Sequence, residues 1–303
     1  MVGEMQFDKI GIIIVMFAPK NGDIENVKII AEYYKGVIVD NSRTRNFDAD
    51  NVGMMKYVFL GENTGIANAQ NVGLRYLGML EELNYVLFFD QDSRVGKEYP
   101  LSMVTEYEKI KKRVTNLGLL GPTVVEIGTQ QEYNSIFHTY QVSDDGFEKR
   151  RDIISSGSIV ECCVIKDVGY MLSTLFIDFV DYEWCWRAEA KGYVVGITRN
   201  VCINHKVGVS DMNIWRYKVQ IWSPFRYFYQ FRNHLWLCAL PYVPFQWKVA
   251  VSIKHLIRLL YFPLFVSNGW KCWKNMLRGV FAFQKHHKDF KEEVKYYYKY
   301  KKN

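Results

Sequence analysis

Residues 85–93 read Tyr85-Val86-Leu87-Phe88-Phe89-Asp90-Gln91-Asp92-Ser93, so an apolar run leads directly into two carboxylates. A short aromatic and β-branched run of this kind is typical of a buried strand. Ligands of open α/β sheets bind beyond the carboxyl ends of the strands. Two Asp side chains one residue apart can reach one divalent cation, which keeps coordination positions for phosphate oxygens. The stretch predicts a metal-bound diphosphate at a strand end, although an ordinary surface turn is an alternative.

The segments before this stretch alternate between strand and helix patterns. Strands are predicted at 10–17, 36–39 and 56–60, and helices at 26–34 and 66–83. Such alternation favours an α/β fold whose mixed sheet is mainly parallel and flanked by helices on both faces. After Asp92 we expect a helix at 101–114, a strand at 119–124, and a polar hairpin or mobile loop at 130–151 that could shape an acceptor site. The apolar run 159–165 follows Ser155-Ser156-Gly157-Ser158, and a helix is predicted at 182–191.

The charges are unevenly distributed along the 303 residues. Residues 206–303 hold 18 of the 39 Lys and Arg residues but only 4 of the 32 Asp and Glu residues. A basic, aromatic block of this kind indicates an anionic partner, either nucleic acid or a membrane surface. Because residues 1–205 are net negative, we expect no nucleic-acid cleft there and favour the membrane. We place a soft boundary near residue 210, between a catalytic region (1–210) and a helical basic and aromatic region (211–303).

The cysteines and the apolar segments indicate the compartment. The six cysteines form no Cys-x-x-Cys pair, which favours buried thiols over zinc or a redox dithiol. No signal peptide is visible at the N-terminus, so we expect a cytoplasmic protein. The apolar segment 256–266 is interrupted by Arg258 and Pro263 and is shorter than the ~20 residues of a membrane span. We therefore expect no transmembrane helix.

A second acidic segment contains Asp178, Asp181 and Glu183 at the start of a predicted helix. Acidic side chains in a first turn are favoured by the helix dipole even without a catalytic role. Asp181 is at the expected N-cap, and Glu183 is spaced i,i+4 from Arg187, so these two could simply pair. One of the acids could instead act as a general base, provided that its carboxylate can take a proton from a substrate hydroxyl.

Small and amide residues fill the segment 63–73, which enters a predicted helix and includes Asn63, Gly65, Asn68 and Asn71. This composition lets a phosphate or sugar nucleotide approach the helix N-terminus, where backbone N–H groups point outward. A helix cap with close packing against the sheet is the alternative. Asp40, after the second strand, could accept a hydrogen bond from a pyrimidine base or belong to an ordinary turn.

Three features of the later sequence also carry candidate residues. His205 follows an apolar run and could be a third metal ligand. Arg226, Arg232 and Asn233 lie in a polar and aromatic helix that is suited either to gripping a diphosphate or to interdomain packing. In residues 247–266 the polar and apolar side chains fall on different helical faces, as in an interfacial helix or a core helix with one wet face. The Lys- and Tyr-rich tail suits anionic lipid or plain solvation.

Together these motifs resemble, in their order, the family 2 glycosyltransferases of GT-A fold, and most closely the bacterial rhamnosyltransferases of O-antigen and related surface polysaccharides. The resemblance covers roughly residues 9–240. It rests on Val39-Asp40-Asn41-Ser42, on 63–73, on Phe88-Phe89-Asp90-Gln91-Asp92-Ser93, and on 176–187. The wider family often has Glu-Asp at the base motif, whereas Val180 precedes Asp181 here.

The resemblance implies an inverting transfer from a nucleotide sugar with Mg²⁺ or Mn²⁺ as the metal. It assigns the base to Asp181, with Glu183 and Asp178 as competitors, and the metal to Asp90, Asp92 and His205. It implies dTDP-L-rhamnose as donor, a lipid-linked saccharide as acceptor, and peripheral attachment to the inner face of the cell membrane. The expected nucleotide-sugar contacts are Asp40, Asn63, Gly65, Asn68, Asn71, Asp90, Gln91, Gly157, Arg226 and Arg232.

Two alternative functions remain open at this point, and a third is disfavoured. A UDP-hexose donor is compatible with the same acids, because the fold does not decide the substrate. A sugar-nucleotide pyrophosphorylase would need a Gly-rich phosphate loop after the first strand, which residues 17–22 do not supply. A non-enzymatic membrane or polyanion binder predicts salt-sensitive binding without dependence on nucleotide or metal.

Overall fold

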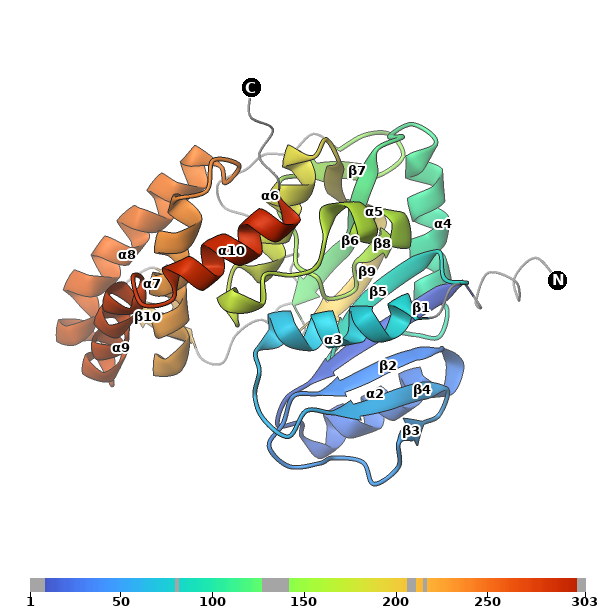
Figure 1. Ribbon diagram of the computed structural model, residues 1–303, viewed down its shortest axis with the longest axis horizontal. Coiled ribbons are helices and arrows are strands. Elements are labelled where there is room, and N and C mark those ends of the chain that lie inside the picture. The colour runs from blue at the N-terminus through green and yellow to red at the C-terminus, as the bar shows by residue number, and fades with distance from the viewer. Residues whose placement is uncertain (1–8, 80–81, 127–141, 206–210, 215–216, 299–303) are drawn as a thin grey trace.

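The computed structural model describes residues 9–79, 82–126, 142–205, 211–214 and 217–298, and of residues 205, 211–214 and 217–220 it describes the backbone alone. A central sheet has the strand order β3-β4-β2-β1-β5-β8-β6-β9-β7. The strands are β1 (Ile10–Met16), β2 (Gly36–Asp40), β3 (Asn51–Val52), β4 (Met55–Phe59), β5 (Tyr85–Asp90), β6 (Leu117–Glu126), β7 (Phe147–Arg150), β8 (Ile159–Glu161) and β9 (Val194–His205). Figure 1 shows this sheet in the middle of the molecule.

The predicted mixed α/β sheet is confirmed, but the expectation that it is mainly parallel is wrong. The strands β4, β2, β1 and β5 are parallel, as are β6 and β9. The other four described pairings are antiparallel, because β8 is inserted between β5 and β6 and because β3 and β7 pair at the edges. The insertion of β8 could not be recognised from the apolar run 159–165, because that run divides into β8 and α5 (Cys162–Val168). Short apolar runs do not distinguish a strand from a buried helix.

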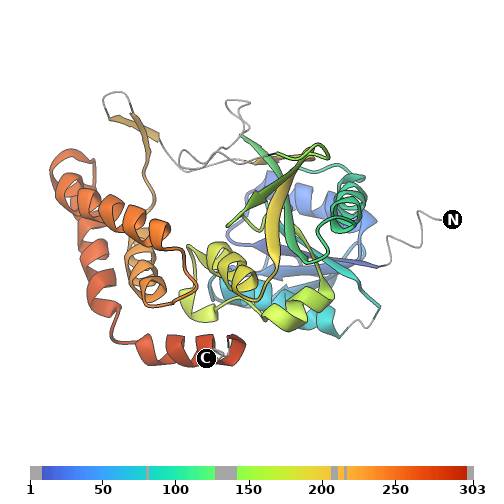
Figure 2. The ribbon, with the colours of Figure 1, turned by 90° about the horizontal axis from the view of Figure 1, so that it is seen from above.

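Helices cover both faces of the sheet, as Figure 2 shows. They are α2 (Asn21–Tyr33), α3 (Ile66–Gly78), α4 (Tyr99–Lys111), α5, a short 3-10 helix η1 (Ser173–Leu175) and α6 (Val180–Ala190). Alternate residues of β1 enter different cores. Ile12 and Ile14 pack in the core that contains α2 and α4 residues, whereas Ile13 and Val15 pack in the core that contains α3 and α6 residues. A strand buried on both faces reads as an unbroken apolar run, which explains the sequence of β1.

The register of the parallel strands brings two predicted site residues to one edge. Asp40 ends β2 and pairs with Met16, while Asp90 ends β5 and pairs with Val15. Both acids therefore lie beside the carboxyl end of β1, on opposite sides of it. This edge is where open α/β sheets bind ligands.

The C-terminal part consists of β10 (Asp211–Ile214), β11 (Tyr217–Gln220), α7 (Pro224–Cys238), α8 (Phe245–Phe265), α9 (Gly269–Ala282) and α10 (His287–Tyr297). The helices α7, α8 and α9 share a small core, whereas α10 packs against η1 and buries Phe290 and Val294 in the core that contains α3 and α6 residues (Figures 1 and 2). There Phe290 stacks on Trp236 with ring centroids 4.9 Å apart. The predicted boundary near residue 210 falls in 206–210, outside the described residues. In the part of the chain that is described, no helix is long and apolar enough to cross a bilayer.

Candidate active site

The turn after β5 is anchored through its backbone and its serine. The Ser93 N–H donates to the Asp90 carbonyl (3.0 Å), and the Asp90 N–H donates to the Ser93 hydroxyl (3.0 Å). The Ser93 hydroxyl also lies 2.8 Å from that of Ser156. The amide of Asn26 donates to the carbonyls of Gln91 (3.1 Å) and Ser93 (2.8 Å). These bonds fix the positions of Asp90 and Asp92, whose residues are partly exposed.

Two predicted nucleotide contacts beside this turn have partners inside the protein. The side-chain carbonyl of Gln91 accepts a hydrogen bond from the Phe17 N–H (2.7 Å), which joins the turn to the end of β1. Asp40 is fully buried and accepts from the Ser42 N–H (3.0 Å), the Asn46 amide (2.8 Å) and the Tyr57 hydroxyl. In this structure the Asp40 carboxylate therefore shapes the turn after β2.

The turns after β2 and β4 are hydrogen-bonded to each other. Asn41 donates to the side-chain carbonyl of Asn63 (3.0 Å) and accepts from the Thr64 N–H (2.7 Å). Gly65, the N-cap of α3, has φ +86°, and a Cβ there would lie 2.5 Å from the carbonyl oxygen of Phe176. Only glycine permits this approach, so the segment 63–65 contacts the loop that precedes α6.

Two other predicted nucleotide contacts prove to be internal. Asn71 is 1% exposed. Its side-chain amide donates a hydrogen bond to the backbone carbonyl of Met171 (2.8 Å) and accepts one from the Met171 N–H (2.9 Å). Gly157 is buried at φ +77°, donates its N–H to Phe88 (2.7 Å) and accepts from the Tyr99 hydroxyl (2.9 Å). We therefore correct their expected role from ligand contact to positioning. Asn68, by contrast, is partly exposed on α3.

The loop before α6 has an unusual backbone. Phe176, Asp178 and Phe179 have φ values of +66°, +66° and +65°, which non-glycine residues rarely adopt. Each such residue costs about 1–3 kcal/mol and persists only where its surroundings impose it. The strained residues lead directly into Asp181, so the backbone strain lies next to the candidate base.

Residues of α7 hold this loop in place. The Asn233 amide donates to the carbonyls of Leu175 (2.8 Å), Ile177 (2.8 Å) and Asp178 (3.2 Å). Arg232 donates to the carbonyls of Thr174 (2.7 Å) and Leu175 (3.2 Å). Its side chain is buried, and burial lowers its pKa to about 10. The expectation that Arg232 grips a diphosphate is corrected, because its guanidinium serves the loop.

Two further contacts support the same segment. Arg226 forms an ion pair with Asp178 and lies over the Trp222 ring at 3.9 Å. From α10, the Glu293 carboxylate accepts from the N–H groups of Ser173 (2.7 Å) and Thr174 (3.0 Å). The loop before α6 is thus held by two C-terminal helices.

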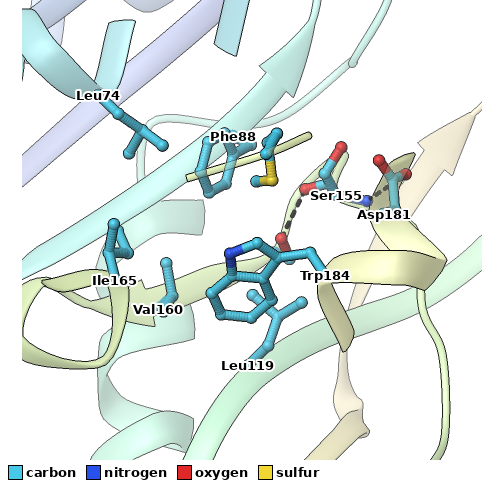
Figure 3. Close-up of a pocket in the computed structure, with 10 residues that line it drawn as sticks. Leu74, Phe88, Leu119, Ser155, Val160, Ile165, Asp181 and Trp184 are labelled. Carbon is cyan, nitrogen blue, oxygen red and sulfur yellow. Dashed lines mark hydrogen bonds between the residues drawn. The ribbon is translucent and has the colours of Figure 1, made fainter. Parts of the chain in front are cut away.

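Asp181 lies in the first turn of α6 and is partly exposed. Its carboxylate accepts a hydrogen bond from the Ser155 N–H (3.0 Å), drawn as a dashed line in Figure 3. Among the described residues it forms no ion pair. Burial, together with the negative charges of Asp90 and Asp178, raises its pKa from 3.8 to about 6, against the lowering effect of hydrogen bonds from Ser155. A carboxylate with a raised pKa can act as a proton acceptor near neutral pH.

Glu183 has a different environment two residues along the same helix. It is fully buried, and its carboxylate pairs with Arg187 (2.8 Å) and accepts from the Tyr242 hydroxyl (2.6 Å). The pairing that the i,i+4 spacing allowed is therefore present. A carboxylate that is neutralised and inaccessible cannot reach an acceptor hydroxyl, so we withdraw Glu183 as a catalytic candidate.

A comparison with characterised proteins identifies the class. No family model matches the chain. It is 30% identical over 233 residues to a dTDP-rhamnosyl transferase, RfbF of Shigella flexneri, and the match covers 73% of this chain and 75% of that protein. The chain belongs to the glycosyltransferases related to this enzyme. It is also 25% identical over 242 residues to a low-salt glycan biosynthesis hexosyltransferase of Haloferax volcanii, covering 74% and 76% of the two chains.

Solved structures show the GT-A fold of this glycosyltransferase. S. aureus TarS superposes with a TM-score of 0.51 at 15% identity, and the match covers 94% of this chain and 52% of that one. GalNAc-T7, crystallised with UDP, GalNAc and Mn²⁺, superposes with a TM-score of 0.50 at 12% identity over 82% of this chain and 54% of that one. The glycosyltransferase therefore spans about half the length of each of these two chains. The relation to these transferases identifies the chain as an enzyme and replaces the purely non-enzymatic alternative.

The metal-binding expectation for this glycosyltransferase rests on Asp90 and Asp92. No group of three His, Cys, Asp or Glu residues in the described part of the chain is arranged to hold a metal ion. The backbone of His205 ends β9 opposite Glu126, but its side chain lies outside the description. Two carboxylates at one turn match the oxygen ligands that Mg²⁺ and Mn²⁺ prefer, and such ions keep other positions for water and phosphate.

Three positioning residues were not foreseen from the sequence as contacts. Ser155 bonds Asp181 through its N–H and accepts from the Gln70 amide (3.0 Å) through its hydroxyl. Asn233 was expected, with Arg226 and Arg232, either to grip a diphosphate or to serve interdomain packing, and Glu293 was not singled out. The serine-rich run before β8 gave a signal for Ser155, whereas nothing local to Glu293 indicates its partner more than a hundred residues earlier.

Proposed function

We propose that this glycosyltransferase transfers L-rhamnose from dTDP-L-rhamnose to a hydroxyl of a lipid-linked oligosaccharide in a single inverting displacement. The donor follows from the likeness to a dTDP-rhamnosyl transferase. The observation that carries the mechanism is the contrast among the acids of 178–183. Asp178 and Glu183 are ion-paired, whereas Asp181 has a raised pKa and no cationic partner among the described residues.

In this mechanism Asp181 removes the proton of the acceptor hydroxyl as the sugar is transferred. The Ser155 N–H holds one carboxylate oxygen, which orients the other toward the acceptor. Apolar side chains around this position, including Phe88, Leu119 and Trp184, exclude water and favour proton uptake (Figure 3). General-base help of this kind contributes roughly 10²–10⁴-fold to the rate.

A divalent cation, Mg²⁺ or Mn²⁺, fits the carboxylates at the end of β5. Asp90 and Asp92 would hold it, and His205 stays a predicted third ligand. When bound, the cation supplies positive charge that stabilises the leaving nucleotide diphosphate. The crystallisation of GalNAc-T7, which shares the fold, with UDP and Mn²⁺ supports a divalent metal for this site.

We further propose that the enzyme acts in surface polysaccharide (O-antigen) synthesis at the cytoplasmic face of the cell membrane. A lipid-linked acceptor resides at a membrane, and residues 206–303 carry the strong excess of positive charge that favours anionic lipid. Arg226 and Asn68, both partly exposed, stay predicted donor contacts together with Asn63 and Gly65.

The test is a nucleotide-release assay with Mn²⁺, detergent-extracted lipid-linked acceptors, and a panel of dTDP-, UDP- and GDP-sugars. We expect release from dTDP-rhamnose, loss of release with EDTA, and a fall of about 10²–10⁴-fold in Asp181→Asn with donor binding retained. Glu189→Gln, in the same helix, is the matched control and should keep its activity. Turnover above a tenth of wild type in Asp181→Asn would place the base elsewhere.

A UDP-hexose is the second candidate donor. It is supported by the 25% identity to a hexosyltransferase over about three quarters of the chain. Release from a UDP-hexose and not from dTDP-rhamnose would keep the mechanism and replace the sugar.

A further inference from the structure

Two polar residues of the helix α8, His255 and Arg258, are turned inward. His255 is 5% exposed, and its ring stacks on Phe231 of α7 with centroids 4.0 Å apart. Arg258 is 9% exposed and donates to the side-chain carbonyl of Gln230 (3.0 Å), also on α7. A helix on a protein surface normally buries its apolar residues and exposes its charges. In α8, by contrast, the polar residues His255 and Arg258 face the rest of the protein.

The opposite face of α8 is apolar and exposed. Eight large apolar residues there are between 40% and 74% exposed, and we call them the apolar face: Phe245, Val249, Ile253, Leu256, Ile257, Leu260, Leu264 and Phe265. Their spacing of mostly three or four residues places them along one side of the helix. In Figure 1, α8 lies at the outer margin of the helical part, away from the sheet. A contiguous apolar surface of this kind marks an interaction site.

Cationic and aromatic side chains accompany the apolar face. Lys254 is exposed within α8. At the start of α9, which follows α8 after a short turn, Lys271 and Lys274 are exposed and Trp270 stacks on Trp273 with centroids 4.6 Å apart. Trp side chains prefer the boundary between lipid and water, and lysines near a membrane are attracted to anionic headgroups.

We propose that the apolar face of α8 lies in the headgroup region of an anionic phospholipid membrane, with the helix parallel to the surface. Exposed apolar residues enter the acyl boundary, while the neighbouring lysines meet the lipid phosphates. A second copy of this chain is a poorer occupant, because residues 206–303 hold 18 cationic and 4 anionic residues and two such regions repel each other. The proposal gives the membrane attachment of the proposed function a defined surface, and it does not depend on the sugar transferred.

The test compares two isoleucines in full-length protein. Ile253 on the apolar face and Ile29 on α2 are exposed to nearly the same extent, 55% and 54%. We would measure co-sedimentation of wild type, Ile253→Glu and Ile29→Glu with vesicles of phosphatidylcholine alone and with added phosphatidylglycerol. We expect wild type to bind the anionic vesicles. Binding by Ile253→Glu should be weaker by about tenfold or more, and binding by Ile29→Glu should equal that of wild type. Thermal melts check that all three proteins are folded.

Sedimentation velocity without lipid tests the competing possibility, that a second copy of this chain covers the apolar face. A wild-type dimer that Ile253→Glu converts to monomer, without vesicle binding, would assign the apolar face to self-association and overturn the proposal. Equal vesicle binding by Ile253→Glu and wild type would overturn it as well. Nucleotide release with detergent-extracted acceptor is measured separately, so failure of membrane binding and failure of the proposed transferase reaction are distinguishable.

Discussion

The two acidic segments of this glycosyltransferase are built differently. At the end of β5, serine and asparagine contacts to the backbone fix a turn that carries Asp90 and Asp92. At the start of α6, the side chains themselves are engaged, since Asp178 pairs with Arg226 and Glu183 with Arg187. Asp181, between them, bonds the Ser155 N–H.

This difference shows how neighbouring acids acquire different properties. A buried carboxylate is stable as an ion when an arginine neutralises it, and it is then chemically inert. At Asp181, burial and the nearby negative charges of Asp90 and Asp178 raise the pKa, so this carboxylate holds its proton more tightly. The contrast between Glu183 and Asp181 can therefore be tested by stability and by pH.

Glu183→Gln should give the largest loss of stability. The substitution leaves the Arg187 charge buried without its counter-ion, which costs about 3–5 kcal/mol. Denaturant unfolding measures the loss. The control is Glu292→Gln, which removes an exposed pair with Lys288 and should change stability by less than about 1 kcal/mol. Equal effects of the two substitutions would mean that burial does not distinguish the acids.

Asn233→Ala tests whether α7 sets the geometry of the loop before α6. Three carbonyls lose a donor, so we expect a loss of about 1–3 kcal/mol in stability. Because the loop leads into Asp181, kcat should also fall at least about tenfold while donor affinity changes little. Asn275→Ala is the control, since that amide bonds only its own helix among the described contacts. A stability loss with unchanged kcat would make Asn233 purely structural.

Asp181→Asn should stabilise the protein at alkaline pH. The folded-state pKa of about 6 exceeds the ordinary value of 3.8, so protonation favours the folded state. That contribution is fully present below pH 3.8 and is lost as the pH rises through 6. At pH 8 the neutral variant should therefore exceed wild type by about 1–2 kcal/mol, and at pH 3.5 the difference should vanish. Melts at both pH values measure this, and a variant that is less stable at pH 8 would contradict it.

The pH profile gives the smallest effect. If Asp181 is the base, kcat/KM should fall about tenfold per pH unit below about 6, because only the ionised form accepts the proton. A profile that stays flat down to pH 4.5 would contradict an elevated pKa. Rates at each pH need a stability control, because the contribution of Asp181 to stability changes over the same pH range.

Local patterns predicted the parallel half of the sheet well. The strands near 10–17, 36–39, 56–60 and 85–90 and the helices between them occur close to the expected positions. The signals of β1, β2 and β5 are strong because these strands are buried on both faces. The antiparallel insertion of β8 could not be predicted, since its pairing with β5 and β6 is decided by tertiary contacts.

The sequence indicated which residues of the candidate site are unusual better than it indicated the role of each one. The acids at 90, 92 and 181 lie at the strand ends or the helix start that their sequence context indicated. Asn71, Gly157 and Arg232 were correctly marked as unusual, but their partners are distant backbone groups. A sequence shows that such a side chain is present, and only the fold shows which group it bonds.

The carboxylate of Glu293 on α10 and the amide of Asn233 on α7 both bond the segment before Asp181. A ribosome adds roughly 5–20 residues per second, so the nascent chain carries Asp181 for several seconds before Glu293 is made. During that interval the strained loop lacks part of its support. The geometry around Asp181 is thus completed only after α10 has been made, and a chain that stops before α10 has the acids without the framework that orients them.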